Sequence, residues 1–203
     1  MSDIMTISRH RMGTDGEGVT TLVGFYGCPL NCKYCANNYC HQSETVRANY
    51  TPEELLKVLS IDDPYFLMSG GGVTFGGGEP LVQAEFIHDL CKMMNPKWRR
   101  TIETSLYAPW ENIALLINDI DYWYVDIKDI NKNIYKNYTG LDNEIVIENL
   151  KKLVEEIPEE MICVRVPLIP GFNTSKSQQE EVDYIRNHIA PNVEIDVFEY
   201  IRC

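Results

Sequence analysis

The stretch that decides the fold is VTTLVGFYG (Val19 to Gly27), followed without a break by CPLNCKYC (Cys28 to Cys35). The first half is rich in β-branched and aromatic residues, which is typical of a buried strand. The second half is a Cys-x3-Cys-x2-Cys loop, and this tight spacing lets three thiolates bind one inorganic centre. The sequence therefore predicts a strand that carries a cysteine loop at its carboxyl end.

The pattern of strand, loop and helix recurs along the chain. Thr51-Pro52-Glu53-Glu54 is a capping box with proline at the first helical position, so a helix is expected to begin there. Period-two and apolar runs predict five further strands, at residues 72–75, 100–105, 122–128, 161–170 and 194–200. Helices are expected between them, at residues 86–94, after Pro109, at 131–138 and 144–156, and from Thr174 or Ser175.

Strands that alternate with helices pair in parallel through right-handed crossovers. We therefore expect an α/β fold with a parallel sheet, specifically a partial (β/α)6 TIM-like barrel in one domain over residues 1–203. The 203 residues are fewer than the roughly 250 of a full eightfold barrel. Functional groups are expected at the carboxyl ends of the strands, beside the cysteine loop.

Composition narrows the class of protein. No apolar run approaches the roughly 20 residues of a membrane span, and the first residues lack the layout of a signal peptide. We expect a cytoplasmic location, where the seven cysteines stay reduced. The net charge of -12 repels phosphates, so neither nucleic acid nor a membrane is an expected partner.

The cysteine loop has two chemical interpretations. Structural zinc usually takes four protein ligands, which would require Cys40 or His41 beside Cys28, Cys32 and Cys35. A 4Fe-4S cluster held by three cysteines instead leaves one iron open to an outside molecule. Cys91 and Cys163 fall in apolar segments and are expected to be packed thiols. Three clustered cysteines favour the iron-sulfur interpretation.

The cysteine loop, taken together with Gly77-Gly78-Glu79-Pro80, resembles the radical S-adenosylmethionine (SAM) superfamily over essentially the whole chain. Within it, the sequence is most similar to glycyl-radical-enzyme activating enzymes of the pyruvate formate-lyase activating type. Four stretches carry this narrower resemblance: Asp15 to Gly18 (DGEG), Ser69 to Phe86 (with GGGVT, GGE and QAEF), Asp126 to Gly140 (DIK, then YTG) and Arg165 to Asn173 (RVPLIPGFN).

The resemblance implies two cofactors, one 4Fe-4S cluster and SAM, and a set of residues around them. Cys28, Cys32 and Cys35 would ligate the cluster. The residues expected to contact SAM are Tyr34, Ala36, Gly77, Gly78, Glu79, Glu103, Thr104, Asp126, Ile127, Lys128, Arg165 and Ile201. Of these, the glycines would let the backbone approach the methionyl end, and Tyr34 would lie against the adenine. Asp15 is expected to contact a substrate loop.

The resemblance also implies the reaction. An electron from the reduced cluster, supplied by flavodoxin or ferredoxin, would cleave SAM to methionine and a 5'-deoxyadenosyl radical under anaerobic conditions. That radical would remove a hydrogen atom from a glycine of a large partner enzyme, the glycyl-radical enzyme, which the open mouth of a monomeric partial barrel would admit. One alternative is a radical SAM enzyme that acts on a small molecule or peptide, like 7-carboxy-7-deazaguanine synthase. Another is a zinc or electron-carrying module without catalytic activity.

The sequence departs from the activating enzymes in places. Thr20 stands where they usually have arginine, and no cysteine-rich insertion follows the cluster loop, so one cluster only is expected. Ile201 occupies the position where the pyruvate formate-lyase type has a histidine. Cys40 and Cys203 receive no role.

Overall fold

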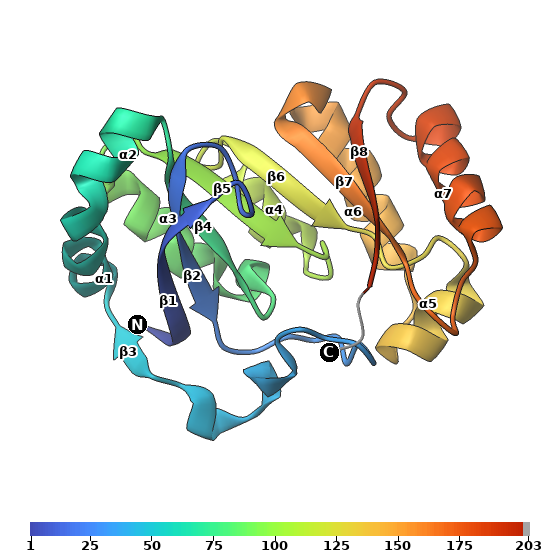
Figure 1. Ribbon diagram of the computed structural model, residues 1–203, viewed down its shortest axis with the longest axis horizontal. Coiled ribbons are helices and arrows are strands. Elements are labelled where there is room, and N and C mark those ends of the chain that lie inside the picture. The colour runs from blue at the N-terminus through green and yellow to red at the C-terminus, as the bar shows by residue number, and fades with distance from the viewer. Residues whose placement is uncertain (201–203) are drawn as a thin grey trace.

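A computed structural model describes residues 1–200, and within them eight strands form one sheet (Figure 1). The strand order is β3-β1-β2-β4-β5-β6-β7-β8. The strands are β1 (Ser2–Met12), β2 (Val19–Phe25), β3 (Ala48–Tyr50), β4 (Gly72–Gly77), β5 (Arg99–Thr104), β6 (Tyr122–Asp126), β7 (Ile162–Leu168) and β8 (Glu194–Glu199). From β2 to β8 all neighbours pair in parallel, whereas β1 is antiparallel to both β2 and β3.

The six parallel strands are the six that the sequence predicts. Within the described chain β3 and β8 are the two edges of the sheet, so the sheet does not close on itself. The expected α/β fold, a partial barrel with a mostly parallel sheet, is thereby confirmed. Because all six strands run the same way, their carboxyl ends meet at the edge of the sheet where β2 leads into the cysteine loop.

Seven α-helices connect the strands within residues 1–200. They are α1 (Pro52–Leu59), α2 (Asp63–Ser69), α3 (Ala84–Met93), α4 (Trp110–Leu116), α5 (Lys132–Thr139), α6 (Glu144–Glu156) and α7 (Ser175–His188). The predicted capping box is formed, since the Glu54 amide donates to the Thr51 hydroxyl and the Thr51 amide donates to the Glu54 carboxylate. Pro109 is the N-cap residue of α4, one position before its first turn. Thr174 is the N-cap residue of α7, and its hydroxyl accepts a hydrogen bond from the Ser177 amide.

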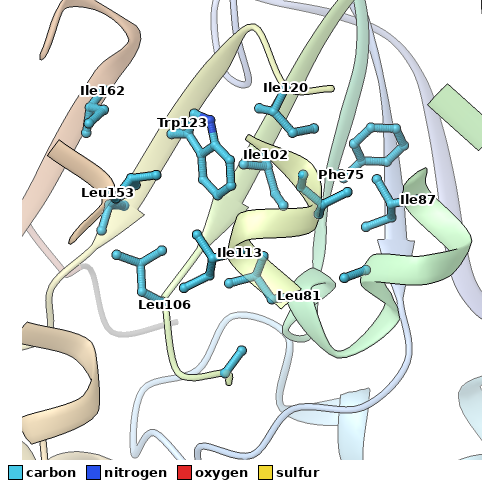
Figure 2. Close-up of a cluster of buried hydrophobic side chains, with 14 of the residues drawn as sticks. Phe75, Leu81, Ile87, Ile102, Leu106, Ile113, Ile120, Trp123, Leu153 and Ile162 are labelled. Atoms are coloured by element: carbon cyan, nitrogen blue, oxygen red, sulfur yellow. The ribbon is translucent and has the colours of Figure 1, made fainter. Parts of the chain in front are cut away.

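The period-two alternation of the strands separates two faces of the sheet. One face packs against the helices, as Figure 2 shows for Phe75, Ile102 and Trp123 on the strands with Ile87 and Ile113 on the helices. The other face carries the alternate residues, including Glu103, Asp126 and Arg165, which are only partly buried. The apolar face thus fixes the orientation of the polar one.

Two strands and one helix were not predicted. β1 pairs with β2 through two register shifts, between Ile4 and Thr6 and between Ser8 and Arg11, which interrupt the alternation that marks a strand. β3 has only three residues, and α2 fully buries only Phe66, so neither gives a periodic signal. Of the helices in residues 1–200, none has the length and apolar character that crossing a membrane requires.

Candidate active site

A cavity of about 230 Å³ lies between the cysteine loop and the carboxyl ends of the parallel strands. Its lining includes all three loop cysteines and many of the residues expected to contact SAM: Ala36, Gly77, Gly78, Glu79, Glu103, Thr104, Asp126, Lys128 and Arg165. Six further lining residues were not singled out as SAM contacts: Leu30, Asn37, Cys40, Ser105, Phe198 and Tyr200. Several of these follow strand ends, which is the signal that could have found them.

The cysteine loop is anchored to the end of α5. The Asn31 amide donates to the Thr139 carbonyl at 2.9 Å, and the Lys33 amide donates to the Tyr138 carbonyl at 3.1 Å. Gly140 ends α5 in the left-handed conformation, with φ of 89°, which glycine adopts without strain. The Tyr138-Thr139-Gly140 motif therefore has a local structural function, because it holds the loop that carries the cysteines.

The loop cysteines are half-buried thiols, and Cys40 is buried beside them. Burial raises the pKa of Cys28 and Cys32, and it raises the pKa of Cys40 to about 11. Cys28, Cys32 and Cys40 are therefore protonated near neutral pH, and metal binding would release protons from those that become ligands. Cys91 and Cys163 are buried and unpaired, as predicted.

Two acidic and two basic side chains form one wall of the cavity. The Arg165 guanidinium donates to Asp126 at 2.7 Å and to Glu103 at 3.0 Å, and it lies 4.9 Å from the centre of the Tyr124 ring. The Lys128 ammonium lies 3.3 Å from Asp126 and donates to the Tyr200 hydroxyl at 2.9 Å. We call Glu103, Asp126, Lys128 and Arg165 the polar wall. Its formal charges balance.

The two acids of the polar wall differ in their electrostatics. Burial acts to raise the pKa of Asp126, but the charges of Lys128 and Arg165 outweigh it and hold that pKa below its usual value. Burial also raises the pKa of Glu103, and there Arg165 only partly offsets it. Asp126 is consequently the stronger acid and is ionised at neutral pH.

Glu79 lines the same cavity and is almost completely buried. Its carboxylate accepts hydrogen bonds from the Thr104 hydroxyl at 2.6 Å, the Ser105 hydroxyl at 2.6 Å and the Ser105 amide at 2.9 Å. The Leu81 amide donates a fourth, at 3.2 Å. Burial raises the pKa of Glu79, and these donors counteract it. Glu79 therefore ties the turn after β4 to the end of β5.

The glycine-rich turn has a packing reason that the sequence did not reveal. A Cβ on Gly77, whose φ is +94°, would lie 2.7 Å from the Gly24 Cα, and a Cβ on Gly78 would lie 2.1 Å from the Gly27 carbonyl oxygen. Both contacts are with the backbone of β2 and its continuation. These glycines let β4 approach the strand that carries the cysteine loop, while their expected approach to SAM stays a prediction.

The structure does not bring every predicted residue to the cavity. The Tyr34 ring packs edge-on against Tyr138 and Phe172, with centroids 6.1 and 5.7 Å away, and its hydroxyl donates to the Pro170 carbonyl. Ile127 is fully buried in the hydrophobic core, because its neighbours Asp126 and Lys128 take the opposite face of the chain. Ile201 and Cys203 lie outside the described residues.

Asp15 lies at the other end of the sheet interior. Its loop joins β1 to the amino end of β2, where Met12 pairs with Val19. Arg11 binds the Asp15 carboxylate, and the Thr74 hydroxyl donates to the Asp15 carbonyl at 2.6 Å. Asp15 is buried, and its charge contributes to the raised pKa of Glu103, a member of the polar wall.

The Radical SAM superfamily model matches residues 22–178, which include the cysteine loop and the polar wall. The chain belongs to the radical SAM superfamily. Members of this superfamily use a 4Fe-4S cluster and SAM, and both are therefore cofactors of this chain. This finding overturns the alternative of a zinc module without catalytic activity.

The chain is also similar to named activating enzymes. It is 29% identical to the 4-hydroxyphenylacetate decarboxylase activating enzyme of Clostridioides difficile (strain 630), over 89% of this chain and 75% of that one. It is 28% identical to the isethionate sulfite-lyase activating enzyme of Nitratidesulfovibrio vulgaris, over 80% of this chain and 73% of that one. A crystal structure of a domain of a pyruvate-formate lyase-activating enzyme from Bacteroides vulgatus matches 63% of this chain and 78% of its own, with TM-score 0.53 and 25% identity.

The thiols at the cavity fit the donor set of these cofactors. A cubane cluster binds each cysteine at a different iron, so its ligands need not converge on one point. Among residues 1–200, no three His, Cys, Asp or Glu side chains are arranged to hold a single metal ion. Cys28, Cys32 and Cys35 nevertheless line one cavity from one loop. Three thiols from one loop on a common cavity are the donor set that a 4Fe-4S cluster with one open iron requires.

Proposed function

We propose that this chain is an activating enzyme that installs a glycyl radical on a large partner protein. The single observation that carries the proposal is the similarity to activating enzymes across most of the chain, in a sheet whose strand ends bring the cysteine loop and the polar wall to one cavity. Three relatives that are 27–29% identical to this chain over 80–93% of its length are activators, which favours a protein substrate over a small molecule or free peptide.

Each group of residues has a proposed role. When bound, the reduced cluster and SAM supply a 5'-deoxyadenosyl radical that accepts a hydrogen atom. Cys28, Cys32 and Cys35 hold the cluster. The polar wall offers carboxylates to the amino group of SAM and cations to its carboxylate, and Ala36, Gly77, Gly78 and Thr104 border the same space. The fixed charges replace water around a charged ligand, which keeps a reactive radical away from solvent.

The remaining predicted residues have supporting roles in this proposal. Tyr34 and Ile127 position the cysteine loop and the end of β6 through their packing. Glu79 positions Thr104 through their hydrogen bond. Asp15, at the opposite end of the interior, contacts the substrate loop of the partner. The opening between the two sheet edges, β3 and β8 within residues 1–200, supports entry of such a loop.

We also propose the setting of the reaction. Flavodoxin or ferredoxin donates the electron in the cytoplasm, and the chain works as a monomeric single domain with one cluster. The alignment to the Clostridioides difficile relative spans 242 positions, more than the 203 residues of this chain, so that relative carries residues within the aligned region that this chain lacks. In this chain no cysteine-rich insertion follows the cluster loop, which supports one cluster. The net charge of -12 disfavours nucleic acid as a partner.

The test is transfer of hydrogen from a glycine of a partner. The anaerobically reconstituted, reduced protein would be mixed with SAM and with purified 4-hydroxyphenylacetate decarboxylase or isethionate sulfite-lyase, each labelled with α-deuterated glycine. We expect an organic radical signal on one of these enzymes and deuterium in the 5'-deoxyadenosine, both absent with a variant that carries Cys28→Ala, Cys32→Ala and Cys35→Ala. 5'-Deoxyadenosine without deuterium, and no radical on either enzyme, would count against an activating role of this type.

A further inference from the structure

A fourth cysteine lies at the cavity and takes no part in the proposed function so far. Cys40 belongs to the short 3-10 helix η1 (Asn38–His41), is 1% exposed and lines the same cavity as the three loop cysteines. Its thiol and the Cys28 thiol share this cavity, and each thiol influences the pKa of the other. The Gly27 amide, next to Cys28 in the chain, donates to the Cys40 carbonyl at 3.0 Å. Backbone and side chain of Cys40 are thus both adjacent to the first cluster ligand.

The position of Cys40 is fixed by its own segment. The Cys40 amide donates to the Asn37 carbonyl at 2.8 Å, and the Asn37 side-chain amide donates to the Gly77 carbonyl at 2.9 Å. The Tyr39 hydroxyl donates to the Asn37 side-chain oxygen at 2.9 Å. These bonds tie η1 to the ends of β2 and β4, the two strands that also position the cysteine loop. The backbone of Cys40 is therefore held beside the cysteine loop, and its side chain is buried there.

We propose that the Cys40 thiol donates a hydrogen bond to the cluster-bound Cys28 sulfur and thereby raises the reduction potential of the 4Fe-4S cluster. Cys28 loses its proton when it becomes an iron ligand, so the hydrogen between the two sulfurs must come from Cys40. Hydrogen bonds to the ligating sulfurs are among the features that set the potential of such clusters, because a donor stabilises the more negative, reduced state.

The same geometry could in principle make Cys40 a fourth ligand instead. Three loop cysteines and Cys40 would then occupy every iron of the cluster and leave none for SAM, which the superfamily requires. If Cys40 instead donates a hydrogen bond to the Cys28 ligand, the fourth iron stays open for SAM. This role also accounts for the burial of Cys40 next to Cys28. The donor role is therefore the one that agrees with the family assignment.

The experiment is a redox titration of the reconstituted cluster, with SAM and any partner omitted. Wild type would be compared with Cys40→Ala, which removes the donor, and with Cys40→Ser, whose hydroxyl can still donate. Cys91→Ala is the matched control, because Cys91 is also a buried, unpaired thiol but lies on α3 within the hydrophobic core. Iron and acid-labile sulfide are measured on every sample, so that only proteins with equal cluster content are compared.

We expect equal cluster content in all four proteins and a lower potential in Cys40→Ala alone. At the wild-type midpoint, the ratio of reduced to oxidised cluster should fall roughly threefold in that variant, about 28 mV for a one-electron couple. Cys40→Ser should recover most of this shift. Equal potentials in Cys40→Ala, Cys91→Ala and wild type would refute the proposal, and so would loss of iron from Cys40→Ala, which would make Cys40 a ligand. Because no partner is present, these outcomes do not depend on the proposed activating function.

Discussion

Buried acid-base groups occur near both ends of the parallel strands, on opposite faces of the sheet, and they differ in what surrounds them. At the amino end, Asp62 is fully buried and accepts hydrogen bonds from Arg9 at 2.8 Å, His10 at 3.0 Å and Thr21 at 2.8 Å. At the carboxyl end, Asp126 is 25% exposed and Arg165 17% exposed, on a cavity that thiols also line. Both sites pair an aspartate with an arginine, but only the pair of Asp126 and Arg165 borders this cavity.

This difference separates a structural role from a functional one. Protein groups surround Asp62, so its charge stabilises the junction between β1, β2 and the start of α2. The side chains of the polar wall border the cavity, so a charged ligand bound there could form hydrogen bonds with them. Changes at the amino end should therefore alter stability, and changes in the polar wall should alter chemistry.

Glycine substitutions should give the largest contrast in stability between the two ends. In Gly78→Ala the new Cβ would meet the Gly27 carbonyl oxygen at 2.1 Å, so the free energy of unfolding should fall by about 3 kcal/mol. Gly70→Ala at the amino end has φ of +71° but open space around its Cβ, and should cost about 1 kcal/mol. Urea unfolding of both variants measures this; equal losses would mean that the close approach of β4 to the cysteine loop is not a constraint.

Replacing Arg165 should affect chemistry more than stability. Arg165→Met leaves Asp126 and Glu103 without their shared cation at the cavity, so the rate of SAM cleavage should fall roughly 100-fold or more. The variant should keep its iron and sulfide content, because the hydrogen bonds and ion pairs of Arg165 are with Asp126 and Glu103 and not with the loop cysteines. Anaerobic assays of 5'-deoxyadenosine check this, and an undiminished rate would show that the polar wall is only a structural salt-bridge network.

Replacing Asp62 should have the opposite result. Asp62→Asn weakens the charge-assisted bonds from Arg9 and His10, and should lower the free energy of unfolding by about 2 kcal/mol. SAM cleavage by the folded fraction should stay within about twofold of wild type, since Asp62 lies at the far end of β2 from the cysteine loop. A large loss of cleavage in a stable Asp62→Asn protein would break the distinction between the two ends.

The smallest expected effect is on how the free energy of unfolding depends on pH, where Asp62 and Glu103 should act in opposite directions. Burial acts to raise the pKa of Asp62, but Arg9 and Thr21 outweigh it and lower that pKa, so the stability that Asp62 contributes is lost as pH falls below about 4. Burial raises the pKa of Glu103, so its contribution falls as pH rises above about 4. The differences in unfolding free energy between wild type and Asp62→Asn, and between wild type and Glu103→Gln, should therefore slope in opposite directions. Parallel slopes would contradict these electrostatics.

The parts of the molecule that follow from local sequence were predictable. The capping box at Thr51, the helix at Glu144–Glu156 and the six parallel strands each carry their own periodic or capping signal. The cysteine loop could be placed because it follows directly on its strand. The polar wall could be placed in part, because strand ends in a parallel sheet meet at one edge.

The parts that depend on contacts between distant segments were not predictable. Ser105 binds Glu79 only because β4 and β5 pair in one register, and Gly78 is required only because β2 passes beside it. Tyr34 packs on Tyr138 and Phe172, which lie far from it in the sequence, while its expected contact with SAM stays a prediction. Cys40 approaches Cys28 through a turn with no periodic signal. Each of these needs the fold before it can be inferred.

The most direct test of the central claim is reductive cleavage of SAM at the cysteine-lined cavity. The protein would be reconstituted anaerobically with iron and sulfide, reduced with dithionite and incubated with SAM. Wild type should release 5'-deoxyadenosine and methionine in equal amounts, and the variant with Cys28→Ala, Cys32→Ala and Cys35→Ala should release neither. A wild-type protein that carries its full cluster and yet neither binds nor cleaves SAM would contradict the account.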